Sequence, residues 1–136
     1  MSVFADTSAL YALLVATEES HEAVRGAFER LVARRRPLHS TSYVLVETVA
    51  LLQHRIGLKP VRDFIESFVP LMEIEHVDAD LHRKGVERLL RESRRRLSLV
   101  DCVSLEFMRE RELPEALALD PHFAQAGFRL VPRQPS

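Results

Sequence analysis

The stretch that most constrains the fold is the first one, where residues 2–14 read SVFADTSALYALL. The apolar run at residues 3–5 is typical of a short strand, and it ends at Asp6. Two hydroxyl residues follow, and a second apolar stretch at 9–16 is long enough to begin a helix. The pattern therefore predicts a strand, a carboxylate, a turn and a helix. In open α/β sheets ligands bind beyond the carboxyl ends of the strands, so Asp6 lies where chemistry is expected.

Strand-like segments alternate with amphipathic helices along the rest of the chain. This alternation predicts an α/β fold with a parallel sheet that is covered by helices on both faces. The further strands are expected at 38–40, 72–77, 115–119 and 128–131, and the further helices at 21–34, 43–52, 58–68, 78–95 and 98–111.

The length and composition fit an ordinary globular protein. The chain has 136 residues, which predicts a single domain over 1–136 with a tail at 131–136. Its one cysteine, Cys102, excludes an internal disulfide and fits a reducing compartment. The longest apolar run, 9–16, is far shorter than the roughly 20 residues of a membrane span, and the amino terminus does not resemble a signal peptide. We therefore expect a cytoplasmic protein without a membrane span.

Four of the 20 acidic residues stand in apolar surroundings, whereas most of the others neighbour charged residues. Asp6 and Asp120 each follow a strand-like run, Glu47 follows three apolar residues, and Asp101 lies between a valine and a cysteine. An ionised carboxylate buried alone costs many kcal/mol, so such a group must be paired, protonated or bound to metal. A doubly wound sheet can bring all four acids to one edge.

Helix capping is the competing interpretation for three of these acids. Asp6 and Asp120 each precede a predicted helix start, where a carboxylate can accept a hydrogen bond from a backbone N–H. Asp101 lies three residues after Ser98, the spacing of a capping box. Glu47 lies inside its predicted helix, beyond the capping turn, so its alternative is an exposed polar stripe.

The types of side chain available indicate which metal could bind. The six histidines show no ligand spacing and the cysteine is single, which gives poor support to a zinc site. Sets of carboxylate oxygens favour Mg²⁺ or Mn²⁺ instead. A nucleic-acid phosphate could approach such an anionic site only through bridging cations, which activate water and stabilise the leaving oxygen. The four acids therefore predict metal-dependent hydrolysis of phosphodiesters.

Four fragments of the chain read FADTSAL around Asp6, TSYVLVETVALL around Glu47, LSLVDCVSLEFM around Asp101 and ALDPHF around Asp120. In this order they resemble PIN-domain nucleases, particularly the VapC-type toxins of bacterial and archaeal toxin–antitoxin systems. The resemblance implies a three-layer α/β/α sandwich with a mainly parallel central sheet. It implies a Mg²⁺- or Mn²⁺-dependent endoribonuclease that cuts RNA, forms a homodimer and is inhibited by a cognate antitoxin protein. It also implies that the four acids are catalytic metal ligands and that Ser8 is a small polar residue near the metal.

The chain departs from the family pattern at one position. The pattern often has Ser or Thr two residues before the fourth acid, where this chain has Ala118, so a supporting hydrogen bond near Asp120 is expected to be missing. His122 and Phe123 match a frequent His-Phe pair, which we interpret as structural. A PIN-like domain that binds RNA or protein without cutting is the alternative: the four intact acids argue against it, and Ala118 keeps it open. An aspartyl phosphotransferase fits less well, because it needs a second acid where Ser8 stands.

Two arginine runs and one apolar segment are candidate contact surfaces. All but two of the 19 basic residues are arginines, whose guanidinium groups suit phosphate. Arg34–Arg36 and Arg94–Arg96 are therefore candidate RNA phosphate contacts, with solvated helix ends as the alternative. The segment 58–68 holds more apolar residues than a small helix needs to bury, which predicts either a partner groove or ordinary core packing.

Overall fold

The computed structural model describes residues 2–133, so the end of the predicted tail, 134–136, lies outside the described residues. Its centre is one sheet in the order β3-β2-β1-β4-β5, in which every neighbouring pair is parallel. The expected α/β architecture is confirmed. Val131 belongs to the last strand, so a tail can begin only after it. The strands are β1 (Val3–Ala5), β2 (Leu38–Thr41), β3 (Met72–Glu75), β4 (Glu115–Leu117) and β5 (Arg129–Val131).

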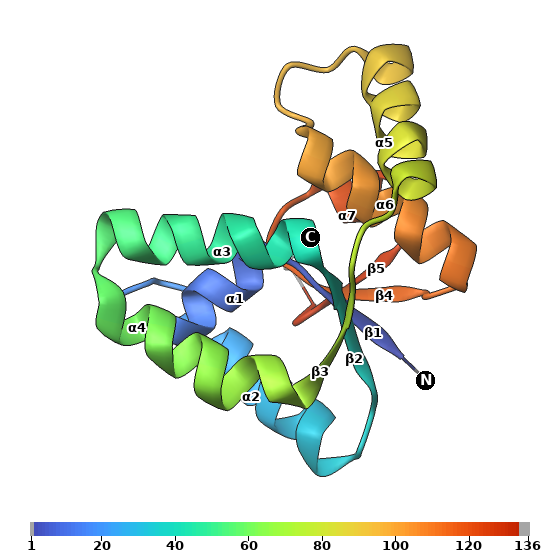
Figure 1. Ribbon diagram of the computed structural model, residues 1–136. Helices are drawn as coiled ribbons and strands as arrows, with labels where there is room; N and C mark the ends of the chain where they lie inside the picture. Colours follow the sequence, from blue (N-terminus) through green and yellow to red (C-terminus); the bar gives the residue numbers. More distant parts are fainter. Residues whose placement is uncertain (1, 134–136) are drawn as a thin grey trace.

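Helices cover both faces of this sheet. Parallel strands need crossover connections that are almost always right-handed, so the two directions of winding from β1 place their helices on opposite faces. Figure 1 shows α1 to α4, in blue to green, on one side of the sheet and α5 to α7, in yellow to orange, on the other. The helices are α1 (Thr7–Leu14), α2 (His21–Ala33), α3 (Ser42–Arg55), α4 (Leu58–Asp63), α5 (Ala79–Glu92), α6 (Leu99–Arg111) and α7 (His122–Gln125).

Several boundaries differ from the sequence prediction for identifiable reasons. Helix α1 begins at Thr7, close to its predicted start, and the Asp6 side chain caps it by accepting a hydrogen bond from the Ser8 backbone N–H. The segment after α4 is a π-helical turn, η1 (Phe64–Phe68), followed by a 3-10 turn, η2 (Val69–Leu71). Helix α5 ends at Glu92 and not at residue 95, because Ser93 adopts a left-handed conformation with φ 49°.

The central strand anchors the core. Val3, Phe4 and Ala5 are at most 1% exposed, as expected of a strand covered on both faces. Phe4 packs against Phe107 of α6 and Phe123 of α7, with ring centroids 5.8 and 6.1 Å apart. Within residues 2–133 no helix has both the length and the apolar character needed to cross a bilayer.

Helices α5 and α6 pack closely at Gly85, and this contact gives a testable prediction. A Cβ atom added at Gly85 would lie 2.4 Å from the Cγ2 atom of Val103. We expect Gly85→Ala to lower the free energy of unfolding by about 1 to 2 kcal/mol, because overpacking outweighs the better helix propensity of alanine. Urea denaturation measures this change. The double variant Gly85→Ala with Val103→Ala should recover part of the loss, and an undiminished stability of Gly85→Ala alone would contradict the close packing.

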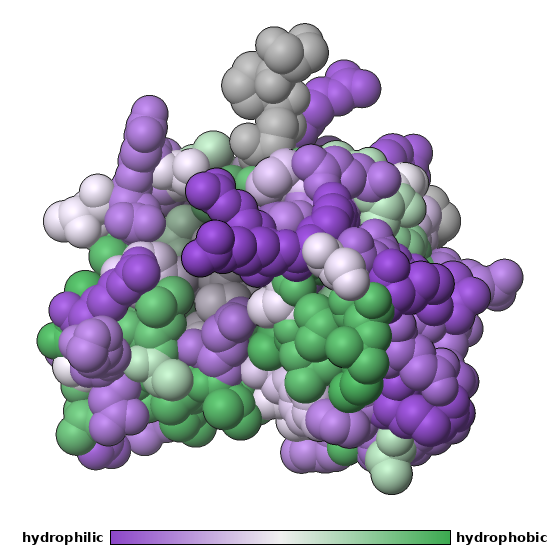
Figure 2. Space-filling model, turned by 90° about the horizontal axis from the view of Figure 1, so that it is seen from above, coloured by the Kyte–Doolittle hydropathy of each residue, from purple (hydrophilic) through white to green (hydrophobic). Residues whose placement is uncertain are grey.

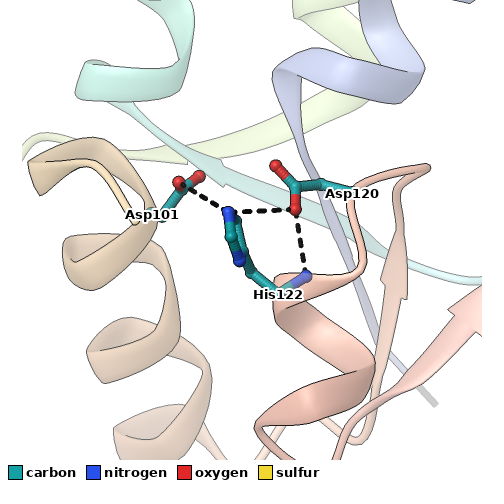
Figure 3. Close-up of side chains that lie close together, drawn as sticks. All are labelled: Asp101, Asp120 and His122. Carbon is teal, nitrogen blue, oxygen red and sulfur yellow. Dashed lines mark hydrogen bonds and ion pairs between the residues drawn. The ribbon is translucent and has the colours of Figure 1, made fainter. Parts of the chain in front are cut away.

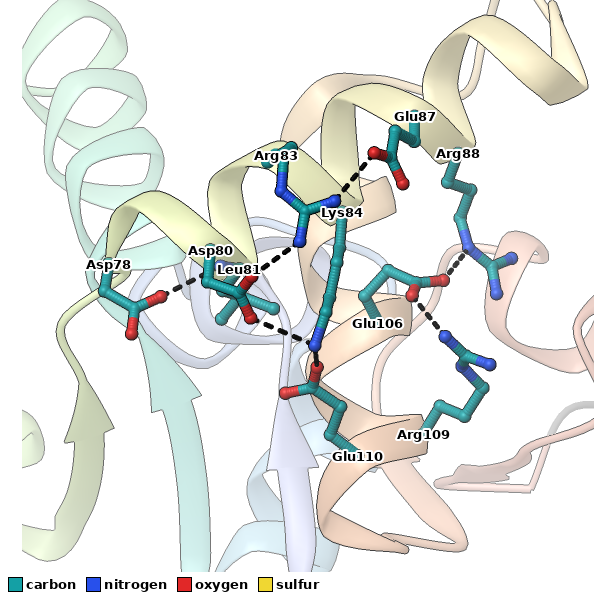
Figure 4. A network of polar contacts seen from close by, with 10 residues as sticks. All are labelled: Asp78, Asp80, Leu81, Arg83, Lys84, Glu87, Arg88, Glu106, Arg109 and Glu110. Carbon is teal, nitrogen blue, oxygen red and sulfur yellow. Dashed lines mark hydrogen bonds and ion pairs between the residues drawn. The ribbon is translucent and has the colours of Figure 1, made fainter.

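A network of charged side chains also joins α5 to α6 (Figure 4). Glu106 of α6 is 3% exposed and accepts hydrogen bonds from Arg88 of α5 at 2.6 Å and from Arg109 at 2.6 Å. Lys84 of α5 pairs with Glu110 of α6. A buried carboxylate is tolerated here because two guanidinium groups compensate its charge.

Candidate metal centre

The candidate site lies at the point of the sheet where the winding changes direction. The chain leaves β1 toward the α1 face and leaves β4 toward the α7 face, and in open α/β sheets ligands bind beyond the carboxyl ends of the strands at such a point. Asp6 follows β1 directly, and Asp120 lies three residues after the end of β4. The tertiary structure thus gives the two acids neighbouring positions at one sheet edge, although they are far apart in the sequence.

Asp6 is the most deeply buried acid of the site. It is 3% exposed, and its Oδ2 atom accepts hydrogen bonds from the Ser8 backbone at 3.1 Å and from the Ser8 hydroxyl at 2.7 Å. Its Oδ1 atom is buried and has no hydrogen-bond partner among residues 2–133. Burial raises the pKa of Asp6 from 3.8 to about 7, and the charges of Asp101 and Glu47 add to this rise, while the Ser8 bonds oppose it.

Asp101 and Asp120 face each other across His122 (Figure 3). Asp101 is 8% exposed and its Oδ2 atom accepts the Ser98 N–H at 3.0 Å. Asp120 Oδ1 accepts the His122 N–H at 3.0 Å. The Nε2 atom of His122 lies 3.8 Å from Asp101 Oδ2 and 3.4 Å from Asp120 Oδ1. Burial, followed by the charge of Asp120, raises the pKa of Asp101 against the opposing hydrogen bonds from Ser98.

Glu47 reaches the site from α3, about a turn and a half beyond its cap. Thr41 caps this helix by accepting a hydrogen bond from the Val44 N–H. One hydroxyl pair, Thr7 with Thr48 at 3.0 Å, ties α1 to α3 beside Glu47. Glu47 is half-buried; desolvation raises its pKa, as do the charges of Asp101 and Asp120, while the Thr7 hydroxyl lowers it.

The four acids come from four separate chain segments and act on one another as one electrostatic cluster, in which Asp101 and Asp120, together with His122, are the group close enough to share one ion among the described residues. Asp6 responds to the charges of Glu47 and Asp101, and Glu47 and Asp101 both respond to Asp120. Like charges this close raise one another's pKa unless a cation compensates them. Among residues 2–133 no Lys or Arg forms an ion pair with any of these four acids. The buried or half-buried arginine pairs involve other acids, such as Glu106 and Glu115.

The capping interpretation and the cluster are both realised. Asp6 caps α1, and Asp101 forms a reciprocal capping box with Ser98. Each cap uses one carboxylate oxygen, Oδ2 in both residues. Capping therefore fixes the orientation of each carboxylate and leaves its Oδ1 atom without a hydrogen bond from the described residues. In this site local helix stability and the placement of the acids depend on the same contacts.

Ser8 joins the ends of the two central strands. Its Oγ atom donates to Asp6 Oδ2 and accepts the Leu119 backbone N–H at 2.9 Å. Because Leu119 bonds to this side chain, β4 ends at Leu117 and not at residue 119 as the sequence predicts. Ala118 is fully buried and brings no polar side chain. The backbone that leads to Asp120 is held instead by the hydrogen bond from the Leu119 N–H to Ser8.

The two arginine runs lie in different places. Arg36 precedes β2 and pairs with Glu115 at the start of β4, at 2.5 Å. Both positions belong to the amino-terminal edge of the sheet, so Arg34–Arg36 lie at the edge opposite the acids, and their contact with RNA phosphate stays a prediction. Arg94–Arg96 lie in the loop that leads into α6 and Asp101, at the same edge as the site.

His122 lies within the acidic site, a position that the sequence analysis did not predict. Phe123 is fully buried against Phe4, as a structural interpretation expects. The His122 ring, however, lies between Asp101 and Asp120, and one atom from each of these three residues falls within 4.8 Å of the others. The sequence signals were its position two residues after an acid and its match to the frequent His-Phe pair, and neither indicates a place between two carboxylates.

The apolar segment after α3 lines an open groove. A cavity of about 450 Å³ between α3 and the turns η1 and η2 is lined mainly by aliphatic side chains, including Val46, Val49 and Ile65. Val46 is 68% exposed and Ile65 is 49% exposed. Figure 2 shows apolar surface on the side of the molecule where α3 and α4 lie, and a separate apolar patch right of the middle of the same view.

Comparisons with known proteins agree with this architecture. Residues 3–129 match the model of the PIN domain. The chain is 37% identical over 128 residues to the 23S rRNA-specific endonuclease VapC20 of Mycobacterium tuberculosis, an alignment that covers 93% of this chain and 95% of the relative. The crystal structure of that VapC20, described as a sarcin-ricin loop cleaving toxin, superposes with a TM-score of 0.81 at 33% identity and covers 93% and 95% of the two chains.

More distant structures share the fold. VapBC2 from Rickettsia felis, solved bound to a DNA fragment from its promoter, gives a TM-score of 0.71 at 13% identity and covers 96% of this chain and 97% of that one. FitAcB from Neisseria gonorrhoeae gives a TM-score of 0.69 at 14% identity, with 96% of each chain covered. Strand order, the grouping of the acids and the extent of the sequence match agree, and the chain belongs to the PIN-domain family.

Proposed function

We propose that this protein is a metal-dependent endoribonuclease and that Asp6, Glu47, Asp101 and Asp120 hold its metal. The observation that carries the proposal is the uncompensated cluster itself, with a buried Asp6 Oδ1 atom that lacks any partner among the described residues. A buried oxygen of this kind costs free energy unless a cation or a proton satisfies it. The PIN-domain match supports the same conclusion, because PIN nucleases generally use divalent metal.

The donor set fits Mg²⁺ or Mn²⁺. All four proposed ligands offer carboxylate oxygens, which hard divalent cations prefer, and the buried Cys102 has a pKa raised by burial to about 11, which disfavours thiolate binding. When bound, such an ion supplies Lewis-acid chemistry that activates water and offsets the charge of the phosphate. Ser8, Ser98 and the His122 backbone hold one oxygen each of Asp6, Asp101 and Asp120 in place. These contacts would orient the remaining oxygens before metal arrives.

The biological role that we propose is that of the toxin in a toxin–antitoxin module. The 37% identical relative is named a 23S rRNA-specific endonuclease, and we propose ribosomal RNA, specifically the sarcin-ricin loop, as the substrate, which implies action in the cytoplasm. We further propose a cognate antitoxin as the partner, with the apolar groove at Val46, Val49 and Ile65 as its docking surface. A homodimer is part of this proposal, and sedimentation of the purified protein tests it.

A non-catalytic RNA- or protein-binding domain is the second candidate, and Ala118 is the observation that favours it. Titrating Mg²⁺ into antitoxin-free protein with a sarcin-ricin loop RNA separates the two functions. We expect cleavage that depends on Mg²⁺ or Mn²⁺ and that stops with a chelator. Binding of the RNA without any metal-dependent cleavage would favour the second candidate.

Replacing Glu47 tests the assignment of the acids. Glu47→Gln keeps the size of the side chain and removes its charge, so we expect at least a 100-fold loss of cleavage, the upper end of what even an indirect metal partner costs. Circular dichroism should show an unchanged fold. Glu66→Gln is the matched control, because Glu66 is exposed on η1 and pairs only with Arg62 in the described chain. Equal cleavage by Glu47→Gln and wild type would remove Glu47 from the metal site.

A further inference from the structure

The loop at residues 93–97, between α5 and α6, presents three exposed arginines on a fixed backbone. Ser93 takes the left-handed conformation, and its hydroxyl donates to the Leu90 carbonyl at 2.8 Å. The Leu97 N–H donates to the Arg94 carbonyl at 3.1 Å, which closes a tight turn, and the Leu97 side chain is 1% exposed. The loop is therefore attached at both of its ends, and its three arginines are exposed, although the Arg94 guanidinium also lies 3.6 Å from Glu92.

Helix α7 holds the middle of this loop. The His122 Nε2 atom lies 2.9 Å from the Arg96 carbonyl oxygen. A second contact runs from the Arg94 guanidinium to Gln125 Oε1 at 2.9 Å. Both α7 residues follow Asp120 closely in the chain, and the His122 N–H also bonds to Asp120. One short helix thus connects the arginine loop to a carboxylate of the site.

The hydrogen bond to Arg96 determines which nitrogen of His122 carries hydrogen. A carbonyl oxygen can only accept, so Nε2 must be the donor. The Nε2 atom that lies between Asp101 and Asp120 then has no free lone pair for a metal ion. Nδ1 is buried and has no partner among the described residues. Although the three side chains are grouped like metal ligands, His122 acts in this arrangement as a hydrogen-bond donor to the loop.

We propose that His122 is a positioning residue for RNA binding, which anchors the 93–97 loop so that its arginines contact phosphates on either side of the one at the acidic cluster. The inference rests on the proposed function, because it concerns the substrate of the same site. The cluster alone repels RNA, and arginines beside it supply the compensating attraction. An anchored loop loses less conformational entropy on binding than a free one, so the anchor contributes affinity without touching the RNA.

Two substitutions at His122 test the proposal. His122→Leu removes the donor, whereas the amide nitrogen of His122→Gln reaches a similar position and keeps it. Each is combined with Glu47→Gln, and binding of a fluorescent sarcin-ricin loop RNA is followed by anisotropy with Mg²⁺ over a range of salt concentrations. We expect His122→Leu to weaken binding about tenfold and to reduce the slope of log K against log[salt] by about 1, the loss of one to two single-strand phosphate contacts.

Cleavage kinetics of the same substitutions in protein that keeps Glu47 distinguish a positioning role of His122 from a catalytic one. We expect His122→Leu to raise KM by a larger factor than it lowers kcat, as for a loss that is mainly of uniform binding, and His122→Gln to restore both KM and the salt slope. An unchanged affinity and salt slope in His122→Leu would overturn the proposal. A lowered kcat at unchanged KM, or a His122→Gln variant as weak as His122→Leu, would also overturn it.

A second variant keeps the test valid if His122→Leu does not fold. Gln125 is exposed, so Gln125→Ala should fold normally while removing the other anchor, and we expect about a threefold weaker affinity, because one of the two α7 contacts remains. No change in Gln125→Ala would overturn the role of α7. If wild type binds RNA but does not cleave it, the proposed function fails, and the anisotropy still decides the role of His122.

Discussion

Asp6→Asn should abolish RNA cleavage and at the same time stabilise the metal-free protein at pH 8. Loss of an indirect metal partner typically costs 10- to 100-fold, so loss of a direct ligand should cost on the order of 1000-fold in kcat/KM. The effect on stability has the opposite sign, because Asp6 is buried among other acids and its pKa is raised to about 7. Function and stability are in conflict at this residue.

The sign of the pH dependence follows from the direction of the pKa shift. In the unfolded chain Asp6 has its ordinary pKa of 3.8, whereas in the folded, metal-free protein its pKa is about 7, so the carboxyl keeps its proton up to about pH 7. Asp6 therefore contributes fully to stability below about pH 4, and this contribution is lost as the pH rises through 7. At 1.36 kcal/mol per pKa unit, the rise in the pKa of Asp6 corresponds to about 4 kcal/mol in the free energy of unfolding.

At pH 8 the Asp6→Asn variant should regain about half of this free energy of unfolding. Its carbonyl oxygen can still accept the two hydrogen bonds from Ser8, but its NH₂ group replaces an oxygen that has no partner among the described residues. We expect a gain of about 2 kcal/mol at pH 8, and roughly 5 to 10 °C in melting temperature for a domain of this size. Thermal melts with chelator at pH 5 and pH 8 measure it, and the gain should be small at pH 5.

Asp63→Asn is the matched control for Asp6→Asn. Asp63 ends α4 on the surface, where the structure pairs it with Lys59, and its replacement should change neither cleavage nor the pH dependence of the melting temperature. Adding Mg²⁺ should stabilise wild type at pH 8 and leave Asp6→Asn nearly unaffected. Cleavage by Asp6→Asn at wild-type rates, or a melting temperature that does not rise at pH 8, would contradict the proposed role of Asp6.

The second large effect is expected at Glu106, away from the site. Burial alone would raise the pKa of Glu106, but hydrogen bonds from Arg88 and Arg109 hold it below its usual value. Glu106→Ala would leave the Arg88 side chain, which is 17% exposed, without this buried partner. Breaking one partner of a buried ion pair typically costs 3 to 5 kcal/mol, and we expect about 3 kcal/mol because Arg88 retains Glu92.

Urea denaturation measures the cost at Glu106, and a double variant separates charge from packing. Replacing both partners, in Glu106→Leu with Arg88→Met, should recover most of the lost stability, since an apolar pair of similar volume avoids the buried charge. Glu87→Ala on α5 is the control, because its contact with Arg83 is exposed and should cost less than about 1 kcal/mol. A stability of Glu106→Ala equal to wild type would show that the pair contributes nothing.

The sequence was informative about the acids because each stands where a carboxylate is unfavourable. Asp6 ends the most buried strand, and Glu47 lies inside an otherwise apolar helix where no cap explains it. Both observations are local, and so is the capping spacing of Ser98 and Asp101. The position of the two arginine runs relative to the acids, by contrast, depends on the tertiary structure. Arg34–Arg36 and Arg94–Arg96 look alike in the sequence, and only the strand order separates them to opposite edges of the sheet.

By itself the sequence determined the alternation of strands and helices, the parallel sheet and the list of acids, because hydrophobic periodicity and local charge are encoded within a few residues. The tertiary structure alone decided that Ser8 joins β1 to the end of β4, and that His122 lies between Asp101 and Asp120 and holds the Arg96 carbonyl. Apart from the contact of His122 with Asp120, these contacts join residues more than 20 positions apart. Their distances depend on how the whole sheet packs its helices, which no short stretch of sequence specifies.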